Sequence, residues 1–578
     1  MALFEQHTLE TEGRFANDAD FQRAGLFKRG GIYIGQTASL LSRKLHYNGA
    51  GSIIVVGKQE VGKTTSLIIP NLLTYDRGSL VVTDPKGVLL PQTMEHRRDV
   101  LGQEIVVLSP WADELKAGLG YDIPDTGFNP LSVLRMNDPA LRDNADMIAG
   151  ILCPIPPTAA TNENSKFFKD SARAILTGLM LLLVARKTAN GQGAATLGEL
   201  YVMAHCTYDE WEEHAREMER AQELYGISLR EYARKILSPM KADRQFAEIE
   251  GEIANALSIY DPNQPLARHV AKNGFNPDDL KRKKMTVYVV CPQNRRAKNK
   301  DWLALVMALC AESICRPGKA APVLLMMEEF ANLGYMEIAR YIAEGREAGL
   351  QAHLTVQSES QLYQNYGQNG LKLFLDLCSI KQFLLIDDEP TAAGISRYIG
   401  KHDVSTNPAR EVWQDVVRPD QLLKMKAREQ IMLISGATPA ALAWIRPYYK
   451  DRLWNWQAGE NPMLTFPKGR KPFWIAARET LHERLPPWVF KRPVYIALAV
   501  IAALIVATLP YPINASIAAA VGLGGLGWWL YWVRPDFAPW NSPVQDEPEE
   551  PSKRVWSPWV VWLFWGFIIL VIVDIWGN

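Results

Sequence analysis

This chain has few cysteines, no net charge and no visible internal repeat. Its 578 residues include only six scattered cysteines, with no C-x-x-C pair and no histidine cluster at zinc-ligand spacing. We therefore expect reduced thiols and no structural zinc site. Lys and Arg together number 63, as do Asp and Glu, so any polyanionic partner must meet a local basic patch. Residues 1–20 are polar and acidic, which predicts no signal peptide.

Short apolar runs alternate with helical patterns along most of the chain. Continuous runs rich in β-branched residues are typical of strands buried in a parallel sheet. They occupy residues 52–56, 79–83, 104–108, 285–290, 323–327, 352–356, 379–386 and 430–434. Between residues 137 and 279 this rhythm stops, and 167–185, 207–222 and 229–258 show helical periodicity. The sequence therefore predicts an α/β core with a mainly parallel sheet, interrupted by an all-helical domain.

Residues 485–578 differ from the rest of the chain in composition. They hold ten of the eighteen tryptophans and three long apolar runs, at 494–509, 513–533 and 556–576. An apolar helix of about 20 residues crosses roughly 30 Å of hydrocarbon, so we predict about three transmembrane helices. The first run is short and is expected to form a hairpin with the second. Lys and Arg precede the first run and lie within 534–554, which predicts that the main body is cytoplasmic.

One motif has a specific chemistry. Residues 57–64 match G-x-x-x-x-G-K-[ST], with an apolar strand before them and a helical run, 65–73, after them. Glycines in such a loop let backbone N–H groups turn onto phosphates, and the following helix adds its dipole. We expect Lys63 to reach the β- and γ-phosphates of ATP and the Thr64 hydroxyl to bind Mg²⁺. The predicted nucleotide-binding residues are Gly57, Lys58, Gln59, Glu60, Val61, Gly62, Lys63, Thr64 and Thr65.

Two acids follow the apolar run 323–327. The carboxyl ends of parallel strands form the edge where ligands bind in open α/β sheets, so these acids are expected to face the phosphates. Glu328 is predicted to hold Mg²⁺ together with Thr64, and Glu329 to polarise the attacking water. The first acid of such a pair is usually Asp, and the longer Glu328 leaves the division of roles between the two acids open.

Two further polar residues lie downstream of the acids. Arg346 precedes the strand predicted at 352–356, and Gln357 follows it. An arginine at a helix end is most often solvated or paired. Near the acid pair, however, Arg346 could reach the γ-phosphate of a neighbouring subunit. Gln357 is predicted to sense the γ-phosphate or a water.

Several motifs occur together in a recognisable order. They lie at 49–73, at 82–87 with Asp84 and Lys86, at 167–174, at 328–334, at 345–362 and at 391–400. In this combination the chain resembles the type IV secretion coupling proteins, the TraG/TraD family of conjugative P-loop ATPases. The resemblance covers roughly residues 30–450. It assigns no chemistry to Asp84 and Lys86.

The resemblance implies a RecA-like core, an inserted helical domain that faces the relaxosome, and a hexamer at the bacterial inner membrane. It also implies ATP-driven transfer of single-stranded DNA and its relaxase into a secretion channel. In the family's terms, Lys63 and Thr64 belong to the Walker A motif, and Glu328 and Glu329 belong to the Walker B motif. Arg346 is the arginine finger that reaches the nucleotide of a neighbouring subunit, and Gln357 is the residue that senses the γ-phosphate. The predicted organisation is an N-terminal segment 1–48, a nucleotide-binding domain in two parts (49–136 and 280–470), the insertion 137–279 and the membrane region 485–578.

The membrane runs are C-terminal here, whereas comparable members of the family have theirs at the N-terminus. Two other functions compete with that of a DNA-translocating ATPase. One is a membrane receptor that recruits protein effectors and uses the nucleotide as a switch. The other is a double-stranded DNA pump like the FtsK family, which lacks support because apolar runs replace its C-terminal DNA reader. The basic stretches 281–284 and 295–300 could line a DNA pore or could be solvated loops.

Overall fold

The computed structural model describes residues 13–39, 42–157, 163–318, 321–357, 359–386, 388–403, 413–435 and 439–463. All belong to one compact unit, residues 1–470, which is built around an eleven-stranded sheet. The strands of this sheet are β1 (Ile32–Thr37), β2 (Lys44–Tyr47), β3 (Ile53–Gly57), β4 (Ser79–Asp84), β5 (Glu104–Leu108), β6 (Met285–Val290), β7 (Val323–Met327), β8 (Leu350–Val356), β9 (Ile380–Leu384), β12 (Glu429–Ile434) and β13 (Ala441–Trp444).

The strand order is β2-β1-β13-β12-β9-β3-β8-β7-β4-β6-β5. From β9 to β5 every pairing is parallel, as the continuous apolar runs predict. On the other side of β9, the strands β12, β13, β1 and β2 extend the sheet by antiparallel pairing. The sequence did not indicate β1, β2 or β13, because β1 and β2 mix polar and apolar residues and β13 has only four residues, none of them β-branched. A separate ribbon pairs β10 (Lys401–Asp403) with β11 (Trp413–Asp415).

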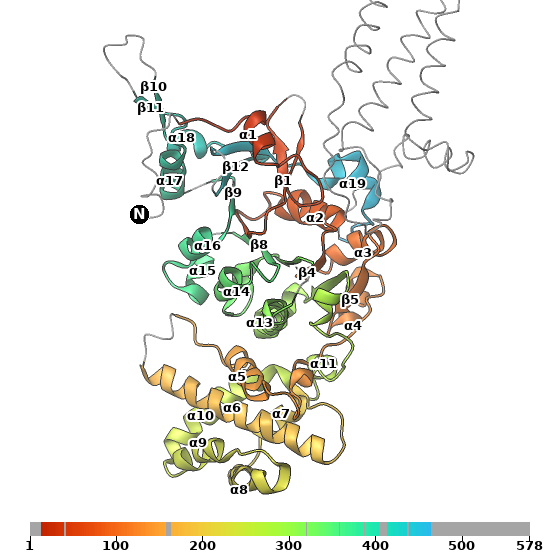
Figure 1. Cartoon of the computed structure of the whole chain (residues 1–578), viewed down its shortest axis with the longest axis vertical. Helices are drawn as coiled ribbons and strands as arrows, with labels where there is room; N and C mark the ends of the chain where they lie inside the picture. The colour runs from red at the N-terminus through yellow and green to blue at the C-terminus, as the bar shows by residue number, and fades with distance from the viewer. Residues whose placement is uncertain are drawn as a thin grey trace, which may run out of the picture. The chain divides into compact units, whose positions relative to one another are not determined.

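Helices cover both faces of the sheet, as Figure 1 shows. One hydrophobic cluster joins one face to α13, α14, α15 and α16, and a second joins the opposite face to α2, α3 and α19. The core helices and turns are α1 (Asp18–Arg23), η1 (Thr64–Ile68), α2 (Ile69–Thr74), α3 (Leu89–Asp99), α4 (Ala112–Leu119), η2 (Pro130–Val133), α12 (Asp279–Arg282), α13 (Gln293–Cys315), η4 (Phe330–Asn332), α14 (Ile338–Glu344), α15 (Glu359–Tyr366), α16 (Gly370–Leu377), α17 (Glu389–Ile399), α18 (Pro419–Leu422), η5 (Tyr448–Lys450) and α19 (Arg452–Gln457).

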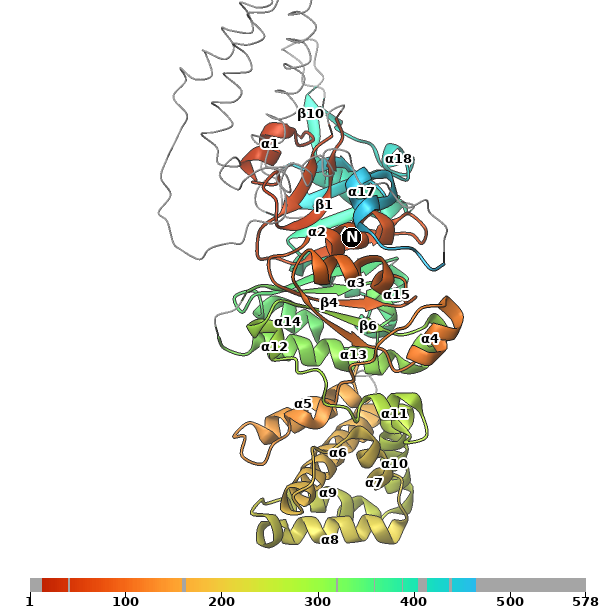
Figure 2. The same ribbon diagram turned by 90° about the vertical axis from the view of Figure 1, so that its right-hand side faces the viewer.

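The described residues between 137 and 279 are helical, with no strand among them, and gather at one end of the unit (Figure 2). The elements are α5 (Leu141–Leu152), α6 (Glu163–Ala189), α7 (Leu197–Ala204), α8 (Tyr208–Tyr225), α9 (Arg230–Met240), α10 (Asp243–Leu257), η3 (Ser258–Tyr260) and α11 (Pro265–His269). Local sequence sets the ends of α8. Thr207 and Glu210 form a capping box at its start, and Gly226 ends it at φ 75°.

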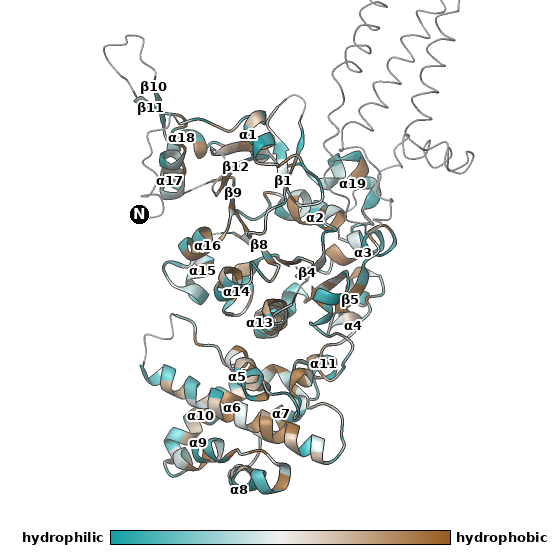
Figure 3. Cartoon of the chain, viewed as in Figure 1, coloured by the Kyte–Doolittle hydropathy of each residue, from teal (hydrophilic) through white to brown (hydrophobic). Residues whose placement is uncertain are grey.

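These inserted helices share a hydrophobic cluster with the sheet. Buried side chains such as Leu176 and Trp211 belong to the same cluster as Leu325 of β7 and Leu305 of α13. Figure 3 shows that the hydrophobic colour gathers in the middle of α6, whereas its N-terminal end is hydrophilic. The insertion therefore packs on the core through apolar contacts that run into the covered face of the sheet.

Transmembrane helices are the part of the predicted fold class that has to be corrected. No helix among the described residues combines the length and the apolar character needed to cross a bilayer. The three predicted spans, 494–509, 513–533 and 556–576, lie outside the described residues. Even α6, with 27 residues, carries Lys169, Asp170 and Arg173, and its uncharged stretch 174–185 is too short to span. The fold class that the structure supports is an α/β core with an inserted helical domain.

Candidate functional site

The loop between β3 and α2 has the geometry of a phosphate cradle. β3 ends at Gly57, and the chain turns through the loop into a π-helical turn, η1, that continues as α2. Gly62 adopts φ +87°, and a Cβ on Gly57 would lie 2.8 Å from the Cβ of Leu384. Both positions therefore need glycine, for backbone conformation and for space respectively. Glu60 also has a positive φ, 65°, so the loop is held in a sparsely populated conformation.

Lys63 lies against this loop. Its ammonium group donates to the carbonyl oxygens of Gly57 and of Lys58, the second at 2.6 Å. Burial lowers the Lys63 pKa to about 8, and the charges of Glu328 and Glu329 oppose this shift. An anion bound in the cradle would favour the charged form in the same way.

Thr64 and Glu328 meet although they are far apart in the sequence. The Thr64 hydroxyl donates to Oε1 of Glu328, and the Glu328 backbone N–H donates to Thr83 Oγ1 at 2.8 Å. Burial raises the Glu328 pKa to about 7, the Thr64 hydrogen bond lowers it, and Asp84 and Glu329 raise it further. Two hard oxygen groups are thus brought together beside the P-loop, and their chemistry fits a Mg²⁺ ion.

Glu329 is held by partners that the sequence did not reveal. Its backbone adopts φ 54° and ψ 46°, and its N–H donates to Thr355 Oγ1 at 3.0 Å. Its Oε2 forms an ion pair with Arg296 and accepts a hydrogen bond from Asn332 at 3.1 Å. The only sequence signal for Arg296 is its place in the basic stretch 295–300, which is compatible with a DNA pore or a solvated loop and does not indicate a contact with Glu329.

Gln357 and Arg346 lie at opposite edges of the sheet. β3 and β8 are parallel, with Val56 beside Val356, so Gln357 follows β8 at the edge where the P-loop follows β3. The half-buried Gln357 accepts a hydrogen bond from Gln361 at 3.2 Å. Arg346 precedes β8, and its side chain is exposed. Because β8 has seven residues, Arg346 lies roughly 20 Å from the P-loop of its own chain.

Asp84 is a structural residue that shapes the same edge. The carboxylate is buried and accepts N–H hydrogen bonds from Val88, Leu89 and Leu90 at 3.1, 2.9 and 3.0 Å. Burial raises the Asp84 pKa to about 6 in spite of these bonds. The carboxylate thus caps the start of α3 and fixes the loop that bears the exposed Lys86.

Replacing Asp84 with alanine is expected to lower the free energy of unfolding by about 2 kcal/mol, because three backbone N–H groups lose their acceptor. Chemical denaturation followed by circular dichroism measures this change. Lys86→Ala is the matched control in the same loop and should change stability by less than about 0.5 kcal/mol. Equal losses in the two variants would mean that the carboxylate does not hold the loop.

Comparison with known proteins identifies the family. A family model described as "Type IV secretory system Conjugative DNA transfer" matches residues 14–471, which is most of the chain. The chain belongs to this family.

Curated relatives agree with this membership in the conjugative DNA-transfer family. Protein VirD4 of Rhizobium radiobacter is 25% identical over 475 residues, which cover 76% of this chain and 64% of the relative. The conjugal transfer protein TraG of the same organism is 24% identical and covers 65% of this chain and 59% of the relative. The matches thus span about three fifths of these relatives' lengths.

Solved structures agree on the fold. The bacterial conjugative coupling protein TrwB, in a form with sulphate, superposes with a TM-score of 0.55 at 16% identity, covering 77% of this chain and 96% of that one. TrwB in complex with ADP and Mg²⁺ gives a TM-score of 0.54 at 15% identity, covering 76% and 93% of the two chains. The RecA-like α/β core predicted from the sequence is therefore the fold of this conjugative DNA-transfer family member.

The two basic stretches of this family member are largely occupied by contacts within the chain. Lys281 donates to the carbonyl oxygens of Ile314 and Arg316, and Lys283 pairs with Glu104 and Asp279. In the second stretch, Arg295 pairs with Glu114 and Arg296 with Glu329. Lys298 and Lys300 are exposed. All of the basic side chains in the two stretches except Lys281 and Arg296 are nevertheless exposed, so the pairing leaves much of this charge at the surface.

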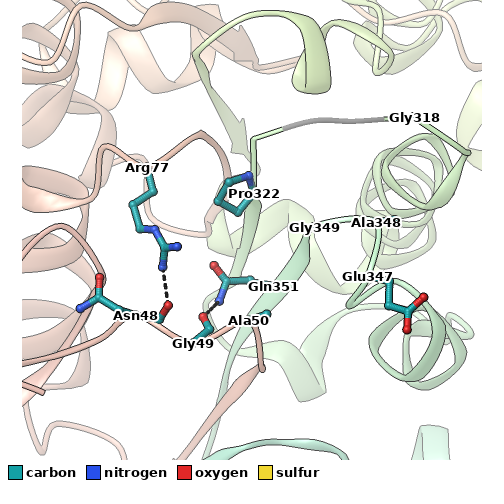
Figure 4. Close-up of a pocket in the computed structure, with 10 residues that line it drawn as sticks. All are labelled: Asn48, Gly49, Ala50, Arg77, Gly318, Pro322, Glu347, Ala348, Gly349 and Gln351. Atoms are coloured by element: carbon teal, nitrogen blue, oxygen red, sulfur yellow. Dashed lines mark hydrogen bonds between the residues drawn. The ribbon is translucent and has the colours of Figure 1, made fainter. Parts of the chain in front are cut away.

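A cleft of about 820 Å³ lies at the sheet edge opposite the P-loop. Its lining includes Pro322 just before β7 and Gly349 just before β8, so it opens at the N-terminal ends of these parallel strands. Figure 4 shows Arg77 donating to the Asn48 carbonyl and Gln351 donating to the Gly49 carbonyl, each at 2.8 Å. This cleft is therefore distinct from the phosphate cradle and shares its edge with Arg346.

Proposed function

We propose that this chain is a Mg²⁺-dependent ATPase that couples ATP hydrolysis to the transfer of single-stranded DNA, with its relaxase, into a type IV secretion channel at the bacterial inner membrane. The observation that carries the proposal is the contact between Thr64 of the P-loop and Glu328 at the end of β7. This contact brings a phosphate cradle and an acid pair to one edge of the sheet. Family membership supports the coupling role, and the nucleotide complexes of TrwB support the choice of ligand.

Each residue of the proposed site has a role that follows from its position. The P-loop N–H groups and Lys63 hold the phosphates, and Thr64 and Glu328 hold Mg²⁺, which neutralises phosphate charge when bound. Glu329 accepts a proton from the attacking water, and Gln357, at the same edge, orients that water or the γ-phosphate. Arg346 is too far from its own P-loop to act there, so it serves the site of a neighbouring subunit, as in a homo-hexamer.

Replacing Arg346 with alanine is expected to lower turnover about a hundredfold or more while nucleotide affinity stays close to wild type. The reason is that an arginine finger stabilises the charge that develops on the γ-phosphate in the transition state. Mixing Arg346→Ala with Lys63→Ala should recover activity at interfaces that pair an intact P-loop with an intact arginine. Steady-state phosphate release over a range of mixing ratios measures this recovery.

Arg340→Ala is the matched control for the finger. This side chain is exposed, like that of Arg346, but pairs with Glu312, Glu337 and Glu344 of its own chain. Turnover within about twofold of wild type is expected, since exposed ion pairs contribute little. If Arg346→Ala loses nucleotide affinity or stability as well as turnover, the assignment to a neighbouring site is wrong.

A receptor that recruits protein cargo, with nucleotide as a switch, is the second candidate. It is favoured by the finding that Lys281, Lys283, Arg295 and Arg296 have partners within the chain, which leaves less basic surface for DNA. The two candidates differ in one measurement, the ATPase rate of the purified chain with and without single-stranded DNA. A DNA-translocating ATPase accelerates with DNA, and a protein receptor does not.

A further inference from the structure

The ion pair between Arg296 and Glu329 engages one carboxylate oxygen, Oε2, of the proposed general base. Both side chains are 15% exposed, so the pair is largely removed from water, and loss of either partner would leave the other charge poorly compensated. Oε2 of Glu329 accepts from Arg296 and from Asn332 at once. This oxygen cannot also accept a proton from a water while both donors are in place.

The backbone of Glu329 is strained in this arrangement. A non-glycine residue at φ 54° and ψ 46° carries a conformational cost of about 1 kcal/mol or more, which the surrounding contacts must offset. The hydrogen bond to Thr355 Oγ1 and the pair with Arg296 are two such contacts. Loss of the ion pair removes one of the contacts that hold this conformation.

Arg296 lies on a segment that is set off from the rest of its helix. Within α13, Asn299 has non-helical angles (φ −110°, ψ 19°), so residues 293–298 form a short helix joined to the longer one by a kink. Just past the kink, the Lys300 carbonyl accepts from the N–H of Gly334, in the chain that follows Glu329. The residues on the two sides of the kink therefore contact Glu329 itself and the chain that follows it.

The charge on this segment points to its ligand. Lys298 and Lys300 are exposed and, among the described residues, form no ion pair, while Arg296, two residues before Lys298, is paired with Glu329. Lysines spaced along a solvent-facing segment match the backbone of a nucleic-acid strand, which carries one negative phosphate per nucleotide. A phosphate bound beside Lys298 and Lys300 would compete with Glu329 for Arg296.

We propose that Arg296 is a positioning residue that holds Glu329 back from the attacking water, and that a single-stranded nucleic acid bound along 296–300 draws Arg296 away and releases the base. This inference rests on the proposed ATPase function and adds to it the link between cargo and hydrolysis. In the released state the water oxygen bonds to the γ-phosphorus as the bond to the bridging oxygen breaks. ADP leaves with that electron pair, and Glu329 takes the water proton.

The test uses the purified full-length chain with Mg²⁺-ATP, with and without oligo(dT). Arg296→Gln is expected to raise kcat without oligo(dT) about threefold to tenfold with little change in KM, because the base is released in every molecule. Oligo(dT) should then add little. Arg296→Lys keeps the charge and should give a kcat between those of wild type and Arg296→Gln. Lys298→Ala with Lys300→Ala should raise the oligo(dT) concentration needed for half-maximal stimulation.

Arg295→Gln is the matched control, because it removes the same charge from the neighbouring residue. Arg295 pairs with Glu114 at the surface and not with Glu329. Its kcat without oligo(dT) should stay within about twofold of wild type, as expected for an exposed ion pair. A thermal melt of each variant shows whether the fold is intact. If the folded Arg296→Gln variant turns over as slowly as or more slowly than wild type, Arg296 assists catalysis or stability and the proposal is overturned.

Failure of the proposal for Arg296 and failure of the proposed ATPase function give different results. If the wild-type chain neither binds a fluorescent ATP analogue nor releases phosphate, the ATPase itself is wrong. If the wild type hydrolyses ATP and Glu329→Gln does not, but oligo(dT) changes neither the wild type nor Arg296→Gln, only the link between nucleic acid and Glu329 fails.

Discussion

Replacing Lys63 with alanine is expected to reduce ATP turnover by at least about a hundredfold, because the ammonium group stabilises charge on the transferred phosphate. In the structure this group already lies over the P-loop carbonyls of Gly57 and Lys58, within the cradle that would hold the phosphates. Nucleotide affinity should fall as well, since the same charge acts on the bound ground state. Steady-state phosphate release and titration with a fluorescent ATP analogue measure the two effects.

Lys116→Ala is a suitable control for Lys63→Ala. Lys116 is an exposed lysine on α4 that pairs with Asp122, so the variant makes the same change in net charge away from the cradle. Its turnover should match that of the wild type. Unchanged turnover in Lys63→Ala would remove the P-loop from the mechanism.

Replacing Glu329 with glutamine is expected to leave nucleotide binding intact and to lower kcat by about a hundredfold or more. Glutamine has the same shape and keeps an acceptor for Asn332, but its amide cannot take a proton from water. The separation of kcat from affinity is the diagnostic result, because the loss of a base acts on the transition state alone. Single-turnover hydrolysis together with equilibrium binding of ATP distinguishes the two quantities.

Glu337→Gln is the control for Glu329→Gln. Glu337 lies just before α14 and pairs with Arg340 on the surface, so its neutralisation should leave kcat unchanged. If Glu329→Gln keeps wild-type kcat, the general base lies elsewhere, and Glu328 becomes the residue to test. That outcome would also reopen the division of roles between the two acids that the longer Glu328 leaves unsettled.

The parallel strands could be predicted because each is a local apolar run. The observed bounds of β5, β6 and β7 coincide with the predicted 104–108, 285–290 and 323–327. The antiparallel extension could not be predicted in the same way. β1 and β2 mix polar with apolar residues, and β13 is a four-residue segment without β-branched residues. The burial of all three depends on neighbours that come from the two ends of the core sequence. The role of Asp84, to which the sequence assigned no chemistry, likewise depends on its three backbone partners in the folded chain.

The sequence by itself determined the P-loop and the two acids after the apolar run 323–327, because each depends on contiguous residues whose geometry is local. Only the tertiary structure decided that Thr64 touches Glu328, that Arg296 binds Glu329, and that Arg346 lies at the edge opposite its own P-loop. Those relations depend on the order and direction of the strands. Long-range packing of the sheet and its helices sets that order, and no short stretch of sequence encodes it.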